Sequence, residues 1–231
     1  MKHVFIVAYG RTGSTALMKA LNCIEGACIR GENGGLIQPL ALSLDLAQAS
    51  KRRHVQDSQD VSRPWFGAEF MRPKRLGEGL ARVFTRTILA PPEGTRITGF
   101  KEIRYASDLL TEEAFEAILR FMLTCFENPH VIFLTRDAEQ VAESAWWQDR
   151  DRDVVLDVLD HTVHRFRMAH EDHPKRTFLI DHATFDGNPE GLRPLLDWLG
   201  EDAPPEALAE ALSERIVKPE EAEAPAVRET A

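Results

Sequence analysis

Short apolar runs, each bounded by polar or turn-forming residues, recur along the chain. The clearest runs cover residues 3–8, 96–101, 130–135 and 177–181. Short, continuous apolar runs are typical of strands that are buried on both faces of a parallel sheet. The pattern therefore predicts four strands.

Helical periodicity appears between these runs. Residues 3–8 are followed by a glycine-containing loop and then by apolar residues at positions 16, 17, 20 and 21. A second helix is predicted to begin at Thr111, with acidic residues in its first turn and an apolar face beyond it. That face comprises Phe115, Ile118, Leu119 and Met122. Because strands alternate with helices, the predicted fold class is α/β, with a parallel central sheet covered by helices on both faces.

The length of 231 residues, 43% of them hydrophobic, is enough for one sizeable core. We expect a single domain over residues 1–218. Residues 48–75 lack a regular pattern and are interpreted as a loop-rich insertion beside the site, acting as a lid or as an acceptor-binding segment. Residues 219–231 are expected to form a disordered, solvated tail.

Charge and cysteine content narrow the possible partners. The 28 basic and 37 acidic residues give a net charge of −9, which argues against a nucleic-acid footprint and requires any anion site to be local. The three cysteines form no CxxC pair and suit a reducing cytoplasm. No segment is long and apolar enough to cross a bilayer, so we expect a cytoplasmic protein. Nothing in the sequence predicts an oligomeric state.

The loop after the first predicted strand has the composition of an anion site. It consists of Gly10, Arg11, Thr12, Gly13, Ser14 and Thr15. A loop that opens a helix presents unpaired N–H groups at the positive end of the helix dipole, and the glycines allow an anion to approach closely. The loop is not a Walker A motif, because Gly13 stands where that motif requires lysine. An ordinary magnesium-dependent NTPase is therefore disfavoured.

Two segments resemble the PAPS-dependent sulfotransferases, particularly the Golgi and bacterial carbohydrate and tyrosylprotein branches. Residues 11–15 are similar to the family's 5′-phosphosulfate loop. Residues 131–144 are similar to the strand and helix that hold the donor's 3′-phosphate, with Arg136 ending the strand and Ser144 on the helix. The resemblance implies a P-loop NTPase-like sulfotransferase architecture with PAPS as donor and PAP as product.

Two further segments extend the resemblance to catalysis. Residues 29–33 resemble a Gly-Glu segment that implies Glu32 as the catalytic base, and residues 99–104 imply that Lys101 lies against the transferring sulfuryl group. Arg11 is implied as a second stabilising cation. No metal is implied. The acceptor hydroxyl would belong to a small molecule, a carbohydrate, a lipid or a tyrosine, and a small or carbohydrate-like acceptor is favoured. Residues 180–183 are Ile-Asp-His-Ala, which differs from the Tyr-Glu-Asp-Leu motif of the family.

Several alternatives remain open from the sequence. The chain is also compatible with a P-loop-like small-molecule kinase, another nucleotide-dependent transferase, or a non-catalytic PAP-binding protein. Glu102 and Arg104 either pair with each other or orient the acceptor. Trp146 and Trp147 are either stacking platforms or core residues. The histidines between residues 161 and 173 are interpreted as a solvated polar face, because their spacing does not match a zinc motif.

Overall fold

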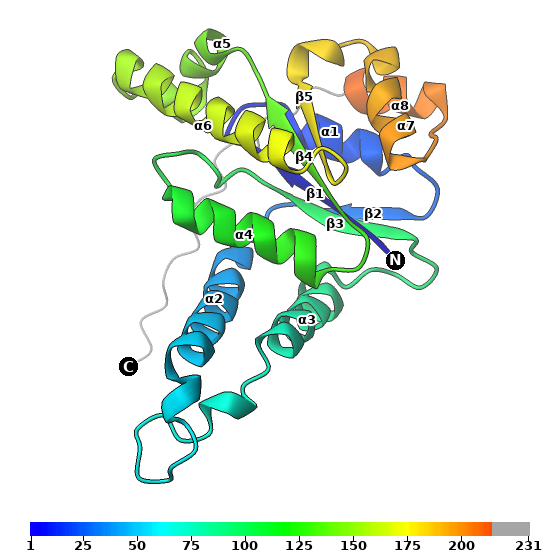
Figure 1. Ribbon diagram of the computed structural model, residues 1–231. Helices are drawn as coiled ribbons and strands as arrows, with labels where there is room; N and C mark the ends of the chain where they lie inside the picture. The colour runs from blue at the N-terminus through cyan, green and yellow to red at the C-terminus, as the bar shows by residue number, and fades with distance from the viewer. Residues whose placement is uncertain (214–231) are drawn as a thin grey trace, which may run out of the picture.

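Five parallel strands form one sheet in the computed structural model, which describes residues 1–213 (Figure 1). The strand order is β2-β3-β1-β4-β5, so the first strand of the chain is central. The strands are β1 (Lys2–Val7), β2 (Ala27–Arg30), β3 (Ile97–Glu102), β4 (Pro129–Thr135) and β5 (Thr177–Asp181). The predicted parallel sheet and its four predicted strands are confirmed.

Of the strands in residues 1–213, the edge strand β2 is the one that the apolar pattern did not predict. It has four residues, of which Ile29 alone is buried. The side chain of Asn22 holds this strand, accepting from the Ile29 amide at 2.8 Å and donating to the Ile29 carbonyl at 3.0 Å. A strand this short and half-exposed depends on such partners more than on its own composition.

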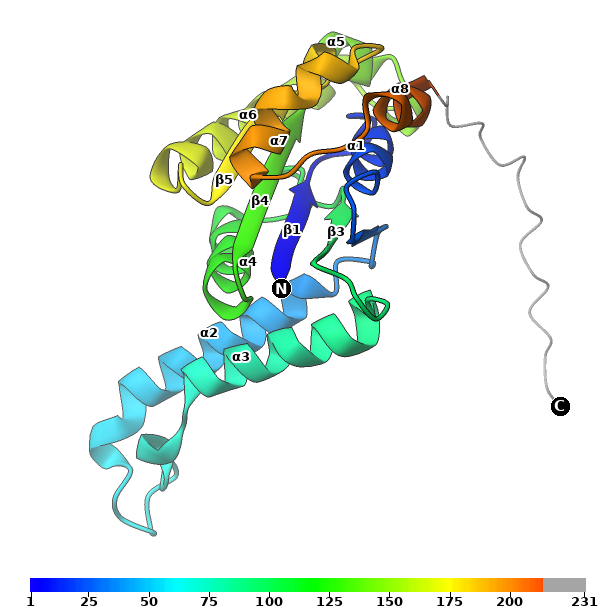
Figure 2. The same ribbon diagram turned by 90° about the vertical axis from the view of Figure 1, so that its right-hand side faces the viewer.

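Helices cover both faces of the sheet, as predicted (Figure 2). Successive side chains of β1 alternate between the two faces, Val4 and Ile6 in one apolar cluster, Phe5 and Val7 in the other. One face carries α1 (Ser14–Leu21), α7 (Arg193–Leu199) and α8 (Pro205–Ser213). The other carries α2 (Ile37–His54), α3 (Pro73–Phe84), α4 (Glu112–Cys125) and α6 (Arg152–Asp172).

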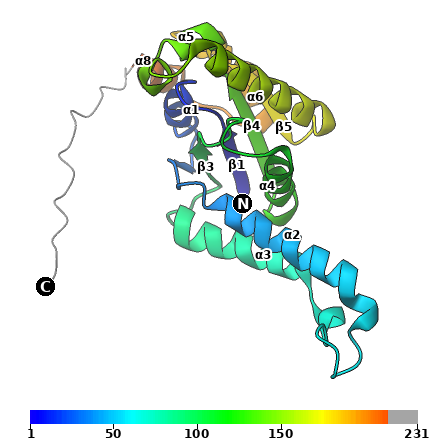
Figure 3. The same cartoon turned by 90° about the vertical axis from the view of Figure 1, so that its left-hand side faces the viewer.

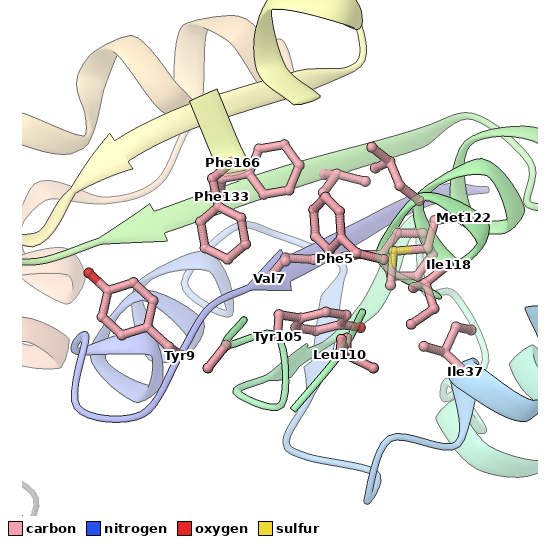
Figure 4. Close-up of a cluster of buried hydrophobic side chains, with 14 of the residues drawn as sticks. Phe5, Val7, Tyr9, Ile37, Tyr105, Leu110, Ile118, Met122, Phe133 and Phe166 are labelled. Carbon is pink, nitrogen blue, oxygen red and sulfur yellow. The ribbon is translucent and has the colours of Figure 1, made fainter. Parts of the chain in front are cut away.

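Aromatic and aliphatic side chains pack together on the second face, as Figure 4 shows. Phe133 of β4 stacks on Phe166 of α6 with ring centroids 5.0 Å apart, and Phe5 packs against Phe100 at 5.1 Å. Tyr9 lies at the end of this cluster, just beyond β1. The close-packed rings make a rigid support for the loops at the carboxyl ends of the strands.

The predicted helix start at Thr111 is confirmed. The Thr111 hydroxyl accepts a hydrogen bond from the amide of Ala114 at 3.3 Å, and Glu112 and Glu113 occupy the first turn of α4. An oxygen acceptor at this position satisfies one of the amides that a helix leaves unpaired at its start. This feature is local, so the sequence alone was sufficient to predict it.

Helices α2 and α3 form an arm that projects from the sheet, and all three views place its end far from α1 (Figures 1, 2 and 3). The expected loop-rich segment is shorter than 48–75, because α2 continues to His54 and α3 begins at Pro73. Residues 55–72 between them include two short 3₁₀ turns, η1 (Val55–Asp57) and η2 (Ala68–Phe70). The segment expected to act as a lid thus forms the distal end of the arm.

Three smaller expectations concern the rest of the chain. The tail at 219–231 lies outside the described residues. Cys23, Cys28 and Cys125 are free thiols. Within residues 1–213, no helix combines the length and the apolar character that a membrane span requires.

Candidate functional site

The loop at residues 10–15 turns sharply from β1 into α1. Arg11 and Gly13 have left-handed backbones, with φ of 72° and 82°. A side chain at Gly13 would collide with the ring of His182, and one at Gly10 would collide with the ring of Trp146. Both glycines are therefore required by close packing, and at Gly13 by the backbone conformation as well.

The loop also offers unpaired hydrogen-bond donors. Within residues 1–213, the amides of residues 10–15 donate to no protein acceptor, whereas the Thr12 hydroxyl is used internally and donates to the Tyr9 carbonyl at 3.1 Å. Gly10, Thr12 and Ser14 are buried. Free amides at the start of a helix attract an anion.

The structure brings Arg136 against this loop. Arg136 follows β4, and its Nη1 atom donates to the carbonyl oxygen of Arg11 at 3.1 Å. Its Nε and Nη2 atoms donate to Oε1 of Gln140, at 3.3 and 3.2 Å. The guanidinium group is thus oriented by Gln140 and directed toward the loop that follows β1.

Ser144 also reaches the loop, but not from a helix. Its hydroxyl accepts a hydrogen bond from Nε of Arg11 at 2.8 Å. The expectation that Ser144 lies on a helix is wrong, because α5 (Ala138–Ala142) ends before it and Ser144 is extended, with φ −114° and ψ 129°. Ala145 then adopts a left-handed conformation with φ 52°, which redirects the chain toward the loop.

The two tryptophans after Ser144 have different roles. Trp147 is buried, and its indole N–H donates to the Gly10 carbonyl at 3.2 Å, so it supports the loop from within the core. Trp146 packs against Gly10 but is 50% exposed. It therefore leaves an aromatic surface beside the loop.

Tyr9 and His182 are site residues that sequence reasoning missed. Tyr9 is fully buried and its hydroxyl bonds to the backbone of Arg136. Burial raises the pKa of Tyr9 to about 12, so the hydroxyl remains protonated. No sequence pattern distinguishes Tyr9. His182 lies within residues 180–183, where the sequence differs from the pattern of the sulfotransferases that it resembles.

His182 packs its ring on Gly13 from a short turn after β5. Burial, followed by the nearby positive charge of Arg136, lowers the pKa of His182, although Asp186 and Asp181 act in the opposite direction. Asp181 is itself held by the Thr135 hydroxyl at 2.8 Å. A neutral ring therefore covers one side of the loop near neutral pH.

A second group of charges lies at the carboxyl end of β3, where Glu32 and Lys101 form an ion pair through Oε1 and Nζ. The Lys101 side chain is 9% exposed and that of Glu32 is 35% exposed. Arg104 approaches the other oxygen of Glu32, Oε2, at 3.7 Å. The structure thus brings together the two residues that the sequence proposed as base and sulfuryl contact.

Glu102 and Arg104 pair with each other, as one of the two interpretations of the sequence expected. Nη1 of Arg104 lies 2.8 Å from Oε1 of the fully buried Glu102 carboxylate. Burial by itself would raise the pKa of Glu102. The hydrogen bonds from the amides of Gly35, Ile103 and Asn33 and from Arg104 outweigh it and lower the pKa. Glu102 therefore holds the backbone just after Glu32 in place.

The two groups flank the end of β1. Lys101 is opposite Ile6 in the β1–β3 register, and the amide of Ala8 donates to the Glu102 carbonyl at 3.1 Å. Arg136 follows β4, which pairs with the other side of β1. In the strand order, β2 and β3 lie on one side of β1, whereas β4 and β5 lie on the other. In open α/β sheets, ligands bind outside the carboxyl ends of the strands at the point where the order changes sides in this way.

Two other features lie apart from this site. The histidines of α6 make ordinary contacts, such as that of His170 Nδ1 with the Thr177 hydroxyl at 2.9 Å, and no three potential metal ligands converge within residues 1–213. A cavity of about 740 Å³ opens near the amino end of β1, lined in part by His3, Ala81 and Phe126. This cavity lies at the amino ends of the strands, whereas the loop at residues 10–15 lies at their carboxyl ends.

No protein-family model matches this chain, and no curated protein sequence matches it either.

Proposed function

We propose that this protein is a PAPS-dependent sulfotransferase with a P-loop NTPase-like architecture, which transfers a sulfuryl group to an acceptor hydroxyl and releases PAP. One observation carries the proposal. Arg136 and Ser144, from the segment after β4, both bond to Arg11 in the loop after β1. A donor with phosphates at its 5′ and 3′ positions needs two such sites side by side.

The residues present suit this donor. The unpaired amides of the loop, with the hydroxyls of Ser14 and Thr15, hold the 5′-phosphate at the start of α1. Arg136 and Ser144 hold the 3′-phosphate, and the guanidinium fork of Arg136 matches phosphate oxygens. The exposed face of Trp146 lies close enough to the loop to stack on the adenine.

Sulfuryl transfer then proceeds by in-line displacement. The acceptor oxygen forms a bond to sulfur while the bond from sulfur to the bridging oxygen of PAPS breaks, and that oxygen leaves with the electron pair on the 5′-phosphate of PAP. Glu32 takes the acceptor proton. Lys101 and Arg11 stabilise the charge that develops on the sulfuryl and bridging oxygens.

The ion pair between Glu32 and Lys101 supports these two roles. The Lys101 ammonium is nearly buried, and Glu32 is its ion-pair partner within residues 1–213. A bound sulfonate supplies a second anion for Lys101, which leaves the Glu32 carboxylate available to the acceptor hydroxyl. Glu102 assists by fixing the backbone at Asn33 and Gly35.

Phosphoryl transfer by a P-loop-like kinase is less well supported. Such enzymes use a lysine in the phosphate loop and an acidic residue near it to hold magnesium. Gly13 takes the place of that lysine. The acid at the end of β3, one of the two strands that pair with β1, is Glu102, and its carboxylate is buried and already accepts from three amides and Arg104.

The proposal is tested in two stages. First, PAP is expected to raise the melting temperature of the protein, whereas ATP with magnesium has a smaller effect. Second, labelled sulfate is followed from PAPS onto a panel of small-molecule, carbohydrate and lipid hydroxyls. Phosphate transfer from ATP without a response to PAP contradicts the proposal. Tight PAP binding that is accompanied by no transfer to any acceptor favours a non-catalytic PAP-binding protein.

A further inference from the structure

The distal end of the arm has a charge opposite to that of the rest of the chain. We call residues 51–75 the arm tip. Within it there are seven basic and three acidic residues, a net charge of +4, although the whole chain has −9. The remaining residues therefore carry −13. The basic residues are Lys51, Arg52, Arg53, Arg63, Arg72, Lys74 and Arg75.

These positive charges are not neutralised by the protein. Within residues 1–213, none of the seven forms an ion pair. Lys51 donates instead to the Met71 carbonyl at 2.9 Å, and Arg72 donates to the carbonyls of Glu69 and Met71. The arm tip is thus a local source of positive potential on an acidic protein.

The same segment exposes large apolar side chains. Val61 is 78% exposed, Phe70 66%, Phe66 53% and Trp65 41%. A single exposed apolar side chain is ordinary in a protein. Four within ten residues, three of them aromatic, are an unusual concentration of exposed apolar side chains, as expected where a protein contacts a partner or a membrane.

The segment is ordered by its own contacts. Ser58 is buried, its hydroxyl donates to the Val55 carbonyl at 2.7 Å, and its carbonyl accepts from the Gly67 amide at 2.9 Å. The ring of Trp65 stacks on His54 with centroids 3.8 Å apart. The exposed aromatic rings are therefore presented on a closed loop rather than on an extended chain.

We propose that the arm tip docks on an anionic lipid bilayer. Aromatic rings insert at the boundary between lipid headgroups and hydrocarbon, and each Lys or Arg near an anionic surface adds electrostatic attraction. A soluble polyanion would bind to the basic side chains of the arm tip but would give no reason for its exposed aromatic rings. A second copy of the chain docking tip to tip would bring like charges together.

The charge distribution also sets the orientation on the bilayer. The net charge of −13 outside the arm tip is repelled by an anionic surface, so the protein approaches with the arm tip first. The tip lies far from α1 in every view (Figures 1, 2 and 3). Docking therefore leaves the loop at residues 10–15 open to solvent. This inference does not depend on the proposed sulfuryl transfer.

The test is co-sedimentation of the full chain with vesicles of phosphatidylcholine alone and of phosphatidylcholine mixed with phosphatidylglycerol. We expect binding to the mixed vesicles, weaker at high salt, and little binding to phosphatidylcholine alone. One variant combines Trp65→Ser, Phe66→Ser and Phe70→Ser, and another combines Arg52→Gln, Arg53→Gln and Arg63→Gln. Each is expected to weaken binding by roughly tenfold to hundredfold.

A matched control carries Arg167→Gln and Met168→Ser, two exposed positions on α6, and is expected to bind like the parent protein. Circular dichroism confirms that each variant is folded. Equal binding to both kinds of vesicle, or unchanged binding by both tip variants, overturns the proposal. So does a concentration-dependent dimer in analytical ultracentrifugation that the serine variant abolishes, because the apolar surface then serves self-association.

Discussion

The Tyr9 hydroxyl bonds to both backbone groups of Arg136, donating to its carbonyl oxygen and accepting from its amide, each at 2.9 Å. Tyr9 follows β1 and Arg136 follows β4, so a single buried hydroxyl joins two strand ends that are 127 residues apart. Tyr9 therefore fixes the backbone of Arg136, and Gln140 orients its guanidinium beside the loop.

We expect Tyr9→Phe to lower the free energy of unfolding by about 1 to 3 kcal/mol, because it leaves the part-buried amide and carbonyl of Arg136 without this partner. Tyr105→Phe is the matched control. Tyr105 is similarly buried, but its hydroxyl has no hydrogen-bond partner among residues 1–213, so its removal is expected to be neutral or stabilising. Denaturation in urea measures both variants, and equal losses would remove the structural role of the Tyr9 hydroxyl.

Arg136→Ala is expected to weaken PAP binding by about 1.5 to 3 kcal/mol, the range for a hydrogen bond to a charged group. Arg136→Lys should recover part of this loss, since it keeps the charge but not the fork. Isothermal titration calorimetry provides the measurement. Arg167→Ala, an exposed position on α6, is the control, and an unaltered affinity in Arg136→Ala contradicts the assignment of the 3′-phosphate site.

Glu32→Gln is expected to lower the turnover number by roughly 100-fold to 10,000-fold, the usual contribution of a general base, while PAP affinity stays nearly constant. Glutamine keeps the size of the side chain and an oxygen for Lys101 but cannot take a proton at neutral pH. Initial rates of labelled-sulfate transfer test this. Glu116→Gln, an exposed position on α4, should match the parent, and a fully active Glu32→Gln would exclude Glu32 as the base.

Gly13→Ala is expected to destabilise the protein more than Gly34→Ala. Both glycines have positive φ, 82° and 72°, so both variants carry a backbone cost of about 1 to 2 kcal/mol. The space around Gly34 is open, whereas a Cβ at Gly13 meets the His182 ring. Adding His182→Ala to Gly13→Ala should restore the stability that is lost to the collision with the ring. Thermal unfolding is measured for the parent, the two single variants and this double variant. Equal melting temperatures for Gly13→Ala and Gly34→Ala would refute the packing argument.

The pH dependence of stability should contain a contribution from Glu102. Because its pKa is lower in the folded protein than its ordinary value of 4.5, the folded state binds fewer protons. The stabilisation is then complete above 4.5 and is lost as the pH falls through the folded pKa. Glu102→Gln is expected to be less stable at neutral pH and to lose less stability on acidification. Urea denaturation over a pH series, with Glu116→Gln as control, measures how the free energy of unfolding changes with pH.

The sequence determined the features that depend on neighbouring residues. Four strands, the alternation of strands with helices and the cap at Thr111 follow from hydrophobic periodicity and local hydrogen bonding. The glycine-rich loop and its unpaired amides were visible for the same reason. The end of α5 at Ala142 was not, because Ser144 is extended and Ala145 is left-handed, and the local sequence requires neither conformation.

Only the tertiary structure decided which distant groups meet. The bonds of Tyr9 to Arg136, the packing of His182 on Gly13 and the burial of Glu102 join segments dozens of residues or more apart. The direction of the arm was decided in the same way, by packing of α2 against α4. Hydrophobic patterning specifies which face of an element is buried, but the partner on that face depends on how the whole chain packs.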